Sequence, residues 1–189
     1  FANDIPLNLS RWPNDSTVLI GKVLEAGTGE NVQDAPLPVF QYFEERPSAW
    51  SQAGPFWIGG YFAHGYASDM IRVDHLDSKT KTIYTAQQTV YGFMTGADWR
   101  CWYALNLLEE LDLPGEYVID KENEKMYVYL PADTRTLHVS VMNDPLIAIE
   151  NCQNVTLSKL TFEYGRSIGI YLENTHHVRI TGCTIRNVG

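Results

Sequence analysis

The feature that most constrains the fold of this chain is an internal repeat of 23 residues in its last third. The segment Ile147–Glu163 (IAIENCQNVTLSKLTFE) aligns with Ile170–Arg186 (IYLENTHHVRITGCTIR), and five of the 17 aligned columns are identical. At ordinary composition about one identity is expected by chance. A repeat of roughly 20 to 50 residues is typical of architectures in which successive copies stack on one another.

Apolar residues alternate within each copy of the repeat, which indicates short strands with one buried face. In the first copy the alternating pairs are Ile147 and Ile149, Val155 and Leu157, and Leu160 and Phe162. Three strands in 23 residues leave only short corners, so the unit coils and each strand lies beside its equivalent in the next copy. This pattern predicts the rungs of a parallel β-helix. A β-sandwich is the competing interpretation, but it does not require register to be kept at every corner.

Two asparagines support the stacked interpretation. Asn151 and Asn174 occupy the same position in the two copies. At a shared corner an amide side chain can form a hydrogen bond with its counterpart one rung away. Leu137 and Val139 lie 23 residues before Leu160 and Phe162 and suggest part of a preceding turn.

The first 136 residues show no such repeat and indicate irregular, mostly antiparallel β structure. Turn residues and apolar runs predict the strands Thr17–Glu25, Trp57–Phe62, Met70–Leu76 and Lys81–Thr85. Lys121–Lys125 is expected to join Glu116–Asp120 to Met126–Leu130 as a hairpin. Helical spacing of Leu105, Leu108 and Leu111 predicts one short helix over Trp102–Leu111.

These patterns together predict an all-β protein with two domains. Residues 1–134 are expected to form an inserted, compact, mostly antiparallel β barrel or sandwich with one short helix. Residues 135–189 are expected to begin a right-handed parallel β-helix that is incomplete in this chain.

Composition excludes some functions. The chain has 14 basic and 23 acidic residues, a formal charge of −9. A broad basic surface for nucleic acid or an anionic membrane is therefore not expected, and no apolar run reaches the roughly 20 residues of a membrane span. Cys101, Cys152 and Cys183 lack metal-ligand spacing and are expected to be small buried hydrophobic residues. We predict no metal and no organic cofactor; the oligomeric state is not indicated.

Several strings, taken together, resemble a known family. They are LNLSRWPND (Leu7–Asp15), WIGGYF (Trp57–Phe62), ALNLLEELDLPGEYVID (Ala104–Asp120), KMYVYLP (Lys125–Pro131), LTFEYGRSIGI (Leu160–Ile170) and VRITGCTIRNVG (Val178–Gly189). In this order they resemble bacterial right-handed parallel β-helix proteins of the carbohydrate-active class, in particular glycoside hydrolases with an inserted β domain, including α-L-fucosidase and xylanase members.

The resemblance implies a secreted or periplasmic bacterial enzyme that hydrolyses glycosidic bonds of a polysaccharide or oligosaccharide. It also implies that the helix begins before Leu7 and continues for many rungs beyond Gly189, with the catalytic carboxylates on those later rungs. On this interpretation the chain is an internal fragment that is inactive alone, and the catalytic residues are not assigned.

By the same resemblance, the outward residues of the third strand of each rung line the substrate groove. Glu163 and Arg186 occupy equivalent positions one rung apart, roughly 5 Å between backbones. Glu163 is then a sugar-hydroxyl acceptor or a catalytic carboxylate, and Arg186 orients it; the alternative is a solvated ion pair that contributes little. Arg166 either reaches across the groove or caps a turn carbonyl. Hydrolysis requires two carboxyl groups at about 5–5.5 or 6.5–9.5 Å, and only Glu163 faces the presumed groove.

Two other functions remain open. A polysaccharide lyase on the same fold needs an acidic sugar, a base and often Ca²⁺, but the charge of −9 repels polyuronates and clustered Asp ligands are missing. A non-catalytic carbohydrate-binding or adhesin solenoid is the second. A carbohydrate is the expected partner in each case. Five aromatic residues either stack on sugar rings or pack in a β core: Trp50, Trp57, Tyr61, Trp99 and Trp102.

Overall fold

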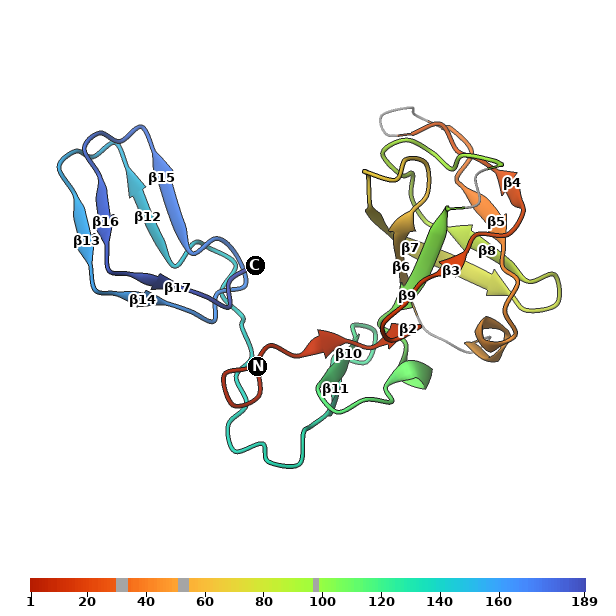
Figure 1. The fold of residues 1–189 in the computed structure, drawn as a ribbon, viewed down its shortest axis with the longest axis horizontal. Coiled ribbons are helices and arrows are strands. Elements are labelled where there is room, and N and C mark those ends of the chain that lie inside the picture. Colours follow the sequence, from red (N-terminus) through yellow and green to blue (C-terminus); the bar gives the residue numbers. More distant parts are fainter. Residues whose placement is uncertain (30–33, 51–54, 97–98) are drawn as a thin grey trace. The chain divides into compact units, whose positions relative to one another are not determined.

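The computed structural model describes residues 1–29, 34–50, 55–96 and 99–189, and the chain it describes is all-β. It divides into two compact units (Figure 1). The sheet unit is Asn8–Leu130, and the ladder unit joins Phe1–Leu7 to Pro131–Gly189. Within the described ranges, no helix has the length and apolar character needed to cross a membrane.

The first seven residues belong to the ladder unit, whereas the sequence interpretation grouped them with the first domain, residues 1–134. The side chain of Asn3 explains this placement. It accepts hydrogen bonds from the backbone N–H groups of Arg135 (2.8 Å) and Thr136 (3.2 Å), and it donates one to the carbonyl of Asp133 (2.9 Å). The second domain was expected to cover residues 135–189; the unit that the structure shows resumes at Pro131.

The sheet unit is built on one antiparallel sheet of short strands, ordered β2-β9-β6-β7-β8-β5-β4, with β3 also paired to β9. The strands are β2 (Arg11–Trp12), β3 (Val18–Leu19), β4 (Val23–Glu25), β5 (Val39–Gln41), β6 (Trp57–Tyr61), β7 (Asp69–Asp77), β8 (Thr82–Thr85) and β9 (Cys101–Leu105). Among the described residues the outermost strands do not pair with each other, so the sheet is open. The closed barrel, one of the two predicted forms, is not observed.

Aromatic and aliphatic side chains fill the core of the sheet unit. Trp102, on β9, is completely buried, and the rings of Trp12, Phe40 and Trp50 contact it with centroids 5.7, 5.7 and 6.4 Å away. Close packing of large rings supplies much apolar burial from few residues. The buried cluster contains Ile20, Phe40, Tyr42, Trp50, Phe56, Ile58, Phe62, Ile71, Val73, Ile83, Phe93, Trp102, Ala104 and Leu107.

The helix predicted over Trp102–Leu111 is wrong. Cys101–Leu105 is strand β9, and only Leu108–Glu110 is helical, as a single 3₁₀ turn, η2. A second 3₁₀ helix, η1, covers Arg46–Trp50. Strand β9 lies between β6 and β2, and its residues Trp102, Ala104 and Leu105 are buried, while Cys101 and Tyr103 are partly buried. Such a short, continuous apolar run is not distinguished from a buried helix by periodicity alone.

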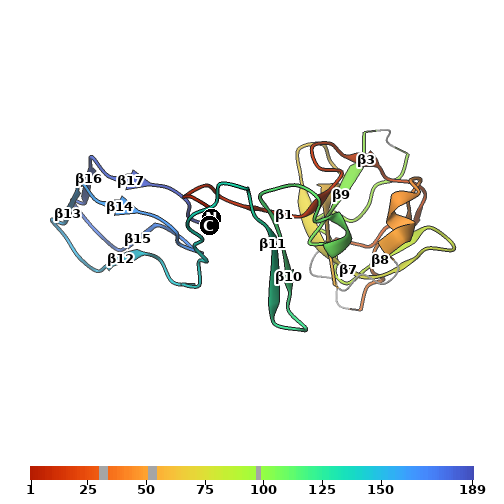
Figure 2. The same ribbon diagram turned by 90° about the horizontal axis from the view of Figure 1, so that it is seen from below.

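A small three-stranded sheet completes the sheet unit, in the order β1-β10-β11. The predicted hairpin is confirmed: β10 (Glu116–Asp120) pairs antiparallel with β11 (Lys125–Tyr129). Strand β1 (Asn8–Leu9) pairs parallel with β10. Figure 2 shows β10 and β11 extending side by side.

The ladder unit contains three pairs of parallel strands whose members lie 23 residues apart. Strand β12 (Ile147–Glu150) pairs with β15 (Ile170–Glu173), β13 (Thr156–Ser158) with β16 (Arg179–Thr181), and β14 (Thr161–Phe162) with β17 (Thr184–Ile185). Ile147 lies opposite Ile170, and Leu157 lies opposite Ile180. The predicted register between the two copies is therefore confirmed (Figures 1 and 2).

The corners of the two copies repeat as faithfully as the strands. Four pairs of residues at the same spacing have left-handed backbone conformations: Asn151 and Asn174, Asn154 and His177, Lys159 and Gly182, and Tyr164 and Asn187. The amide of Asn174 donates to Asn151 Oδ1 at 2.6 Å, as predicted. Left-handed conformations are rare outside glycine and asparagine, so these corners constrain the path of the chain strongly.

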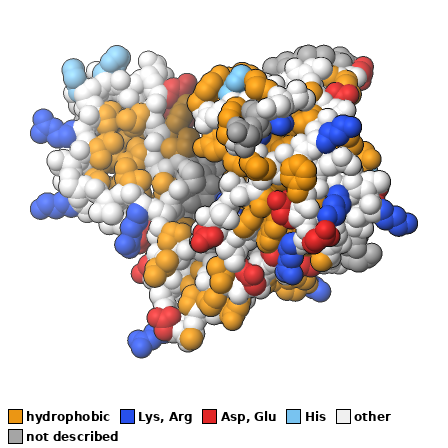
Figure 3. Space-filling model, turned by 45° about the vertical axis from the view of Figure 1, so that its right-hand side comes forward, with side chains coloured by type: hydrophobic (Ala, Val, Ile, Leu, Met, Phe, Trp, Pro, Cys, Tyr) orange, Lys and Arg blue, Asp and Glu red, His pale blue; other side chains and the backbone are white. Residues whose placement is uncertain are grey.

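Burial differs between the two copies. Ile149 and Leu157 in the first copy are 7 % exposed, whereas their partners Leu172 and Ile180 are 43 % exposed. Figure 3 shows hydrophobic side chains gathered on one face of the ladder unit. Each parallel sheet has two strands among the described residues, so a β-helix of several rungs stays a prediction. Leu137 pairs antiparallel with Ala2, not parallel with Leu160 as a preceding turn would.

Candidate functional site

The structure brings Glu163 and Arg186 together. Each residue directly follows a strand, β14 or β17, and these strands pair in register. Arg186 Nε lies 2.7 Å from Glu163 Oε2, and the two side chains are 52 % and 27 % exposed. The expectation that they are neighbours is confirmed. The hydrogen bond from Arg186 to Glu163, together with the negative charge of Glu163, raises the pKa of the Arg186 guanidinium.

Three further polar residues lie around this pair. Tyr164 donates its hydroxyl hydrogen to Asp4 Oδ1, and His138 Nε2 lies 3.9 Å from the same oxygen. The rings of His138 and Tyr164 stack with centroids 4.8 Å apart and planes 12° from parallel. We call Asp4, His138, Glu163, Tyr164 and Arg186 the polar cluster. The hydrogen bond to Asp4 is the largest cause that raises the pKa of Tyr164 to about 12, so its phenol stays protonated near neutral pH.

Hydrogen bonds to backbone carbonyls within the ladder unit position the polar cluster. His138 N–H donates to the carbonyl of Phe1 at 2.9 Å, which holds the first residues beside residue 138. Asn187 Nδ2 donates to the carbonyl of Asp4 at 3.2 Å, and Ser140 Oγ donates to the carbonyl of Tyr164 at 2.7 Å. The left-handed corners at Tyr164 and Asn187 therefore link the N-terminal segment to both copies of the repeat.

Sequence reasoning missed Asp4, His138 and Tyr164. Tyr164 could have been found, because it follows Glu163 and its repeat partner Asn187 occupies the same corner. Asp4 is separated from Tyr164 by 160 positions, and no local pattern signals a contact at that range. His138 lies in the segment that the repeat assigned to a preceding turn.

The polar cluster combines two carboxylates, a guanidinium, a protonated phenol and an imidazole. Glu163 Oε2 accepts from Arg186, and Oε1 has no hydrogen-bond partner among the described residues. Glu163 Oε1 is therefore free to accept a hydrogen bond from a ligand, beside the donor groups of the Arg186 guanidinium. Arg166 is exposed, and no hydrogen bond or ion pair of its side chain is seen in the described ranges.

The cysteines differ from expectation. Cys152 is exposed, while Cys101 and Cys183 are only partly buried, and all three are free thiols. They were expected to be buried, but Cys152 and Cys183 fall at exposed corners and edges of the ladder unit. No group of three or more His, Cys, Asp or Glu residues is placed to hold a metal ion in the part of the chain that the structure describes.

The five aromatic residues considered as a sugar platform do not act together. Trp50 and Trp102 are buried in the core of the sheet unit, and Trp57 is partly buried. Tyr61 and Trp99 are exposed. A platform of all five rings is therefore excluded, and core packing accounts for the two most buried members.

The fold and the site define an all-β protein in which paired parallel strands place the carboxylate of Glu163 beside the guanidinium of Arg186. Comparison with protein-family models, with curated proteins and with solved structures found no match to this chain. The family assignment stays a prediction that rests on the sequence strings quoted above.

Proposed function

We propose that the chain belongs to a glycoside hydrolase of the right-handed parallel β-helix type and that β12–β17 are two of its rungs. The 23-residue register of all three strand pairs supports this proposal, and so do the four left-handed corners that recur in both copies. Stacked rungs with aligned corners are the expected result of such a repeat. The secreted or periplasmic location and the bacterial origin are part of the same proposal, through the family resemblance.

The polar cluster is the observation that carries the functional part of the proposal. Sugars present hydroxyl groups that both donate and accept hydrogen bonds. In the polar cluster, Glu163 Oε1 is a free acceptor, while the Arg186 guanidinium, bonded to Oε2, fixes the carboxylate in place. Charge-assisted hydrogen bonds of this kind are stronger than neutral ones. We assign Glu163 to sugar binding, Arg186 to its positioning, and Arg166 to the rim of the same groove.

The reaction proposed for the enzyme is acid–base hydrolysis by a pair of carboxyl groups. The resemblance places that pair on later rungs, so the polar cluster holds a sugar unit beside the reacting bond. A lyase is the second candidate, because a guanidinium can neutralise a uronate carboxylate. Arg186 is already paired with Glu163, and this pairing favours a neutral sugar and the hydrolase.

Titration of the chain with oligosaccharides, followed by amide NMR shifts, tests the assignment. Xylohexaose and cellohexaose serve as neutral probes and oligogalacturonate as the acidic probe. We expect a neutral probe to shift residues around Glu163 and Arg186, and Glu163→Gln to weaken binding by about tenfold or more, because a charged hydrogen-bond acceptor is lost.

Glu150→Gln is the matched control, because Glu150 is an exposed carboxylate of β12 in the same unit. It should leave binding unchanged. Equal loss in both variants, or no binding of any probe, would contradict the assignment. On the natural gene product, new reducing ends indicate a hydrolase, absorbance of unsaturated uronate indicates a lyase, and bound sugar with neither product indicates a non-catalytic solenoid.

A further inference from the structure

One residue of the N-terminal segment, Asp4, is bonded to both copies of the repeat at the polar cluster. Its carboxylate Oδ1 accepts a hydrogen bond from the hydroxyl group of Tyr164, and its backbone carbonyl accepts one from Asn187 Nδ2 at 3.2 Å. Tyr164 directly follows Glu163, and Asn187 directly follows Arg186. Asp4 therefore holds the two residues that lie next to the pair assigned to sugar binding.

The strands that lead to this pair are short. Strands β14 and β17 have two residues each, whereas β12 and β15 have four. After β17, the backbone N–H of Arg186 donates to the carbonyl of Phe162 at 3.1 Å, and the left-handed corners at Tyr164 and Asn187 follow. A short ladder supplies few of the hydrogen bonds that hold two strands in register. Contacts from another segment therefore matter most at these two corners.

The ring of Tyr164 is held from two sides, which fixes the direction of its hydroxyl group. The Phe1 ring meets it edge-on with centroids 5.1 Å apart, and the His138 ring stacks on it with centroids 4.8 Å apart. His138 also donates its backbone N–H to the carbonyl of Phe1 at 2.9 Å. The phenol is thus preorganised toward Asp4, and preorganised groups lose less conformational entropy when a ligand binds.

Asp4 also acts on Arg186 through its charge. The hydrogen bond from Arg186 to Glu163 and the charge of Glu163 are the largest causes that raise the pKa of Arg186, and the charge of Asp4 acts in the same direction. The hydrogen bond from Tyr164 to Asp4 has an ionised acceptor, and such bonds are stronger than neutral ones. The carboxylate of Asp4 is therefore linked to both members of the pair, to one through the corner and to the other through its charge.

We propose that Asp4 is a positioning residue of the sugar-binding site, which holds the corners after Glu163 and Arg186 and thereby fixes the geometry of the pair. The inference rests on the proposed function of the polar cluster. It adds the N-terminal segment to a site that the repeat alone places on two rungs. Asp4 acts through its neighbours and does not itself contact the sugar.

Substitutions at both ends of the hydrogen bond between Asp4 and Tyr164 test the proposal in the 189-residue chain. Asp4→Ala and Tyr164→Phe each remove this bond and keep the backbone carbonyl that Asn187 contacts. We expect each variant to bind the neutral probe, xylohexaose or cellohexaose, about three- to tenfold more weakly than wild type. The double variant should bind no more weakly than the weaker single variant, because both changes remove the same contact. Additive losses would overturn the inference.

A second readout does not require sugar binding. The Nε–H resonance of Arg186 reports its hydrogen bond to Glu163, and in the free chain Asp4→Ala should speed the solvent exchange of this hydrogen by about threefold or more. Faster exchange in a chain that binds no probe would contradict the proposed function and leave the positioning by Asp4 standing. Unchanged exchange in Asp4→Ala would overturn the positioning, whether or not the wild-type chain binds sugar.

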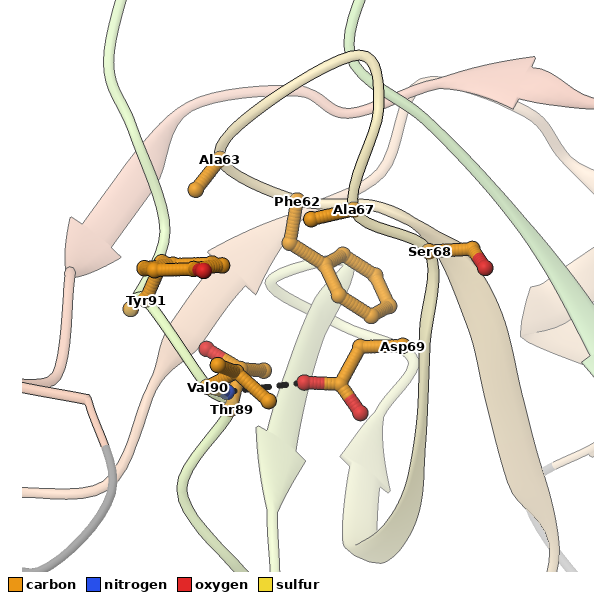
Figure 4. Close-up of a pocket in the computed structure, with 9 residues that line it drawn as sticks. Phe62, Ala63, Ala67, Ser68, Asp69, Thr89, Val90 and Tyr91 are labelled. Atoms are coloured by element: carbon orange, nitrogen blue, oxygen red, sulfur yellow. Dashed lines mark hydrogen bonds between the residues drawn. The ribbon is translucent and has the colours of Figure 1, made fainter.

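Asp69→Ala is the matched control in the sheet unit. Asp69 also joins two segments, because its carboxylate accepts hydrogen bonds from the backbone N–H groups of Met70 and Val90, both at 2.8 Å. Figure 4 shows this carboxylate and its hydrogen bond to Val90. The control should keep the sugar affinity and the Arg186 exchange rate of wild type. A loss as large as that of Asp4→Ala would indicate general destabilisation and would overturn the inference.

Discussion

The sheet unit and the ladder unit are stabilised in different ways. The sheet unit surrounds Trp102 with large buried side chains drawn from most of its strands. In the ladder unit, Ile149 and Leu157 are buried while their partners in the next copy are half exposed, and the copies are joined by ladder hydrogen bonds and matched corners. Stability in the sheet unit is therefore concentrated in a core, whereas in the ladder unit it is distributed along the repeat.

The largest expected effect comes from the centre of the sheet unit. Trp102→Ala should lower the free energy of unfolding by about 3–5 kcal/mol, since it removes a completely buried ring. Ile180→Ala in the ladder unit, at a residue 43 % exposed, should cost only about 1 kcal/mol. Urea unfolding followed by tryptophan fluorescence and by methyl NMR measures both. Equal costs would remove the distinction between the two units.

A buried carboxylate should give the next largest effect. Glu110 is 2 % exposed and accepts hydrogen bonds from Trp50 Nε1 (2.6 Å) and Arg46 Nε (2.7 Å). Glu110→Ala leaves both donors unpaired and should cost about 2–4 kcal/mol. Arg46→Ala removes the cation from this buried carboxylate and should also cost about 2–4 kcal/mol, although the arginine side chain itself is 49 % exposed. Thermal unfolding of the two variants measures both losses, and a negligible loss for either variant would contradict the role of this pair.

The corners of the ladder unit should give a smaller, local effect. Asn151→Ala places alanine in a left-handed conformation and removes the acceptor for Asn174, so a loss of about 1–2 kcal/mol is expected. Asn151→Gly removes the same acceptor without the backbone strain and should lose less. Hydrogen exchange at the amides of β12 and β15 reports the change. If alanine and glycine were equivalent, strain would not contribute to this corner.

The smallest effect concerns the ionisation of Tyr164. Its pKa is raised to about 12, chiefly by its hydrogen bond to Asp4. Since the folded pKa lies above the unfolded value near 10, the contact stabilises the fold fully below pH 10 and this contribution is lost as the pH rises through about 12. Asp4→Asn should lower the pKa of Tyr164, as measured from its Cζ chemical shift. An unchanged pKa would show that Asp4 is not its cause.

The repeat made the ladder unit predictable from sequence. Copies of equal length must place equivalent residues side by side, so the register of Ile147 with Ile170 and the bond between Asn151 and Asn174 follow from spacing alone. Glu163 and Arg186 were found for the same reason. Asp4 was not, because its contact with Tyr164 depends on how the N-terminal segment returns to the ladder, which no local pattern encodes.

The sheet unit was less predictable because its elements are defined by long-range burial. Strand β9 was mistaken for a helix, because its short, continuous apolar run does not show the clear alternation of a half-buried strand. The hairpin of β10 and β11 was found because its turn is local.

Methyl NOESY spectra show whether chain segments 23 residues apart lie against each other in register. We expect cross-peaks between the methyl groups of Ile147 and Ile170, and between those of Leu157 and Ile180. The pair Ile58 and Ile71, opposite each other on β6 and β7, provides the internal reference. Absence of both ladder cross-peaks in a spectrum that shows the reference pair would mean that the two copies of the repeat are not paired in register.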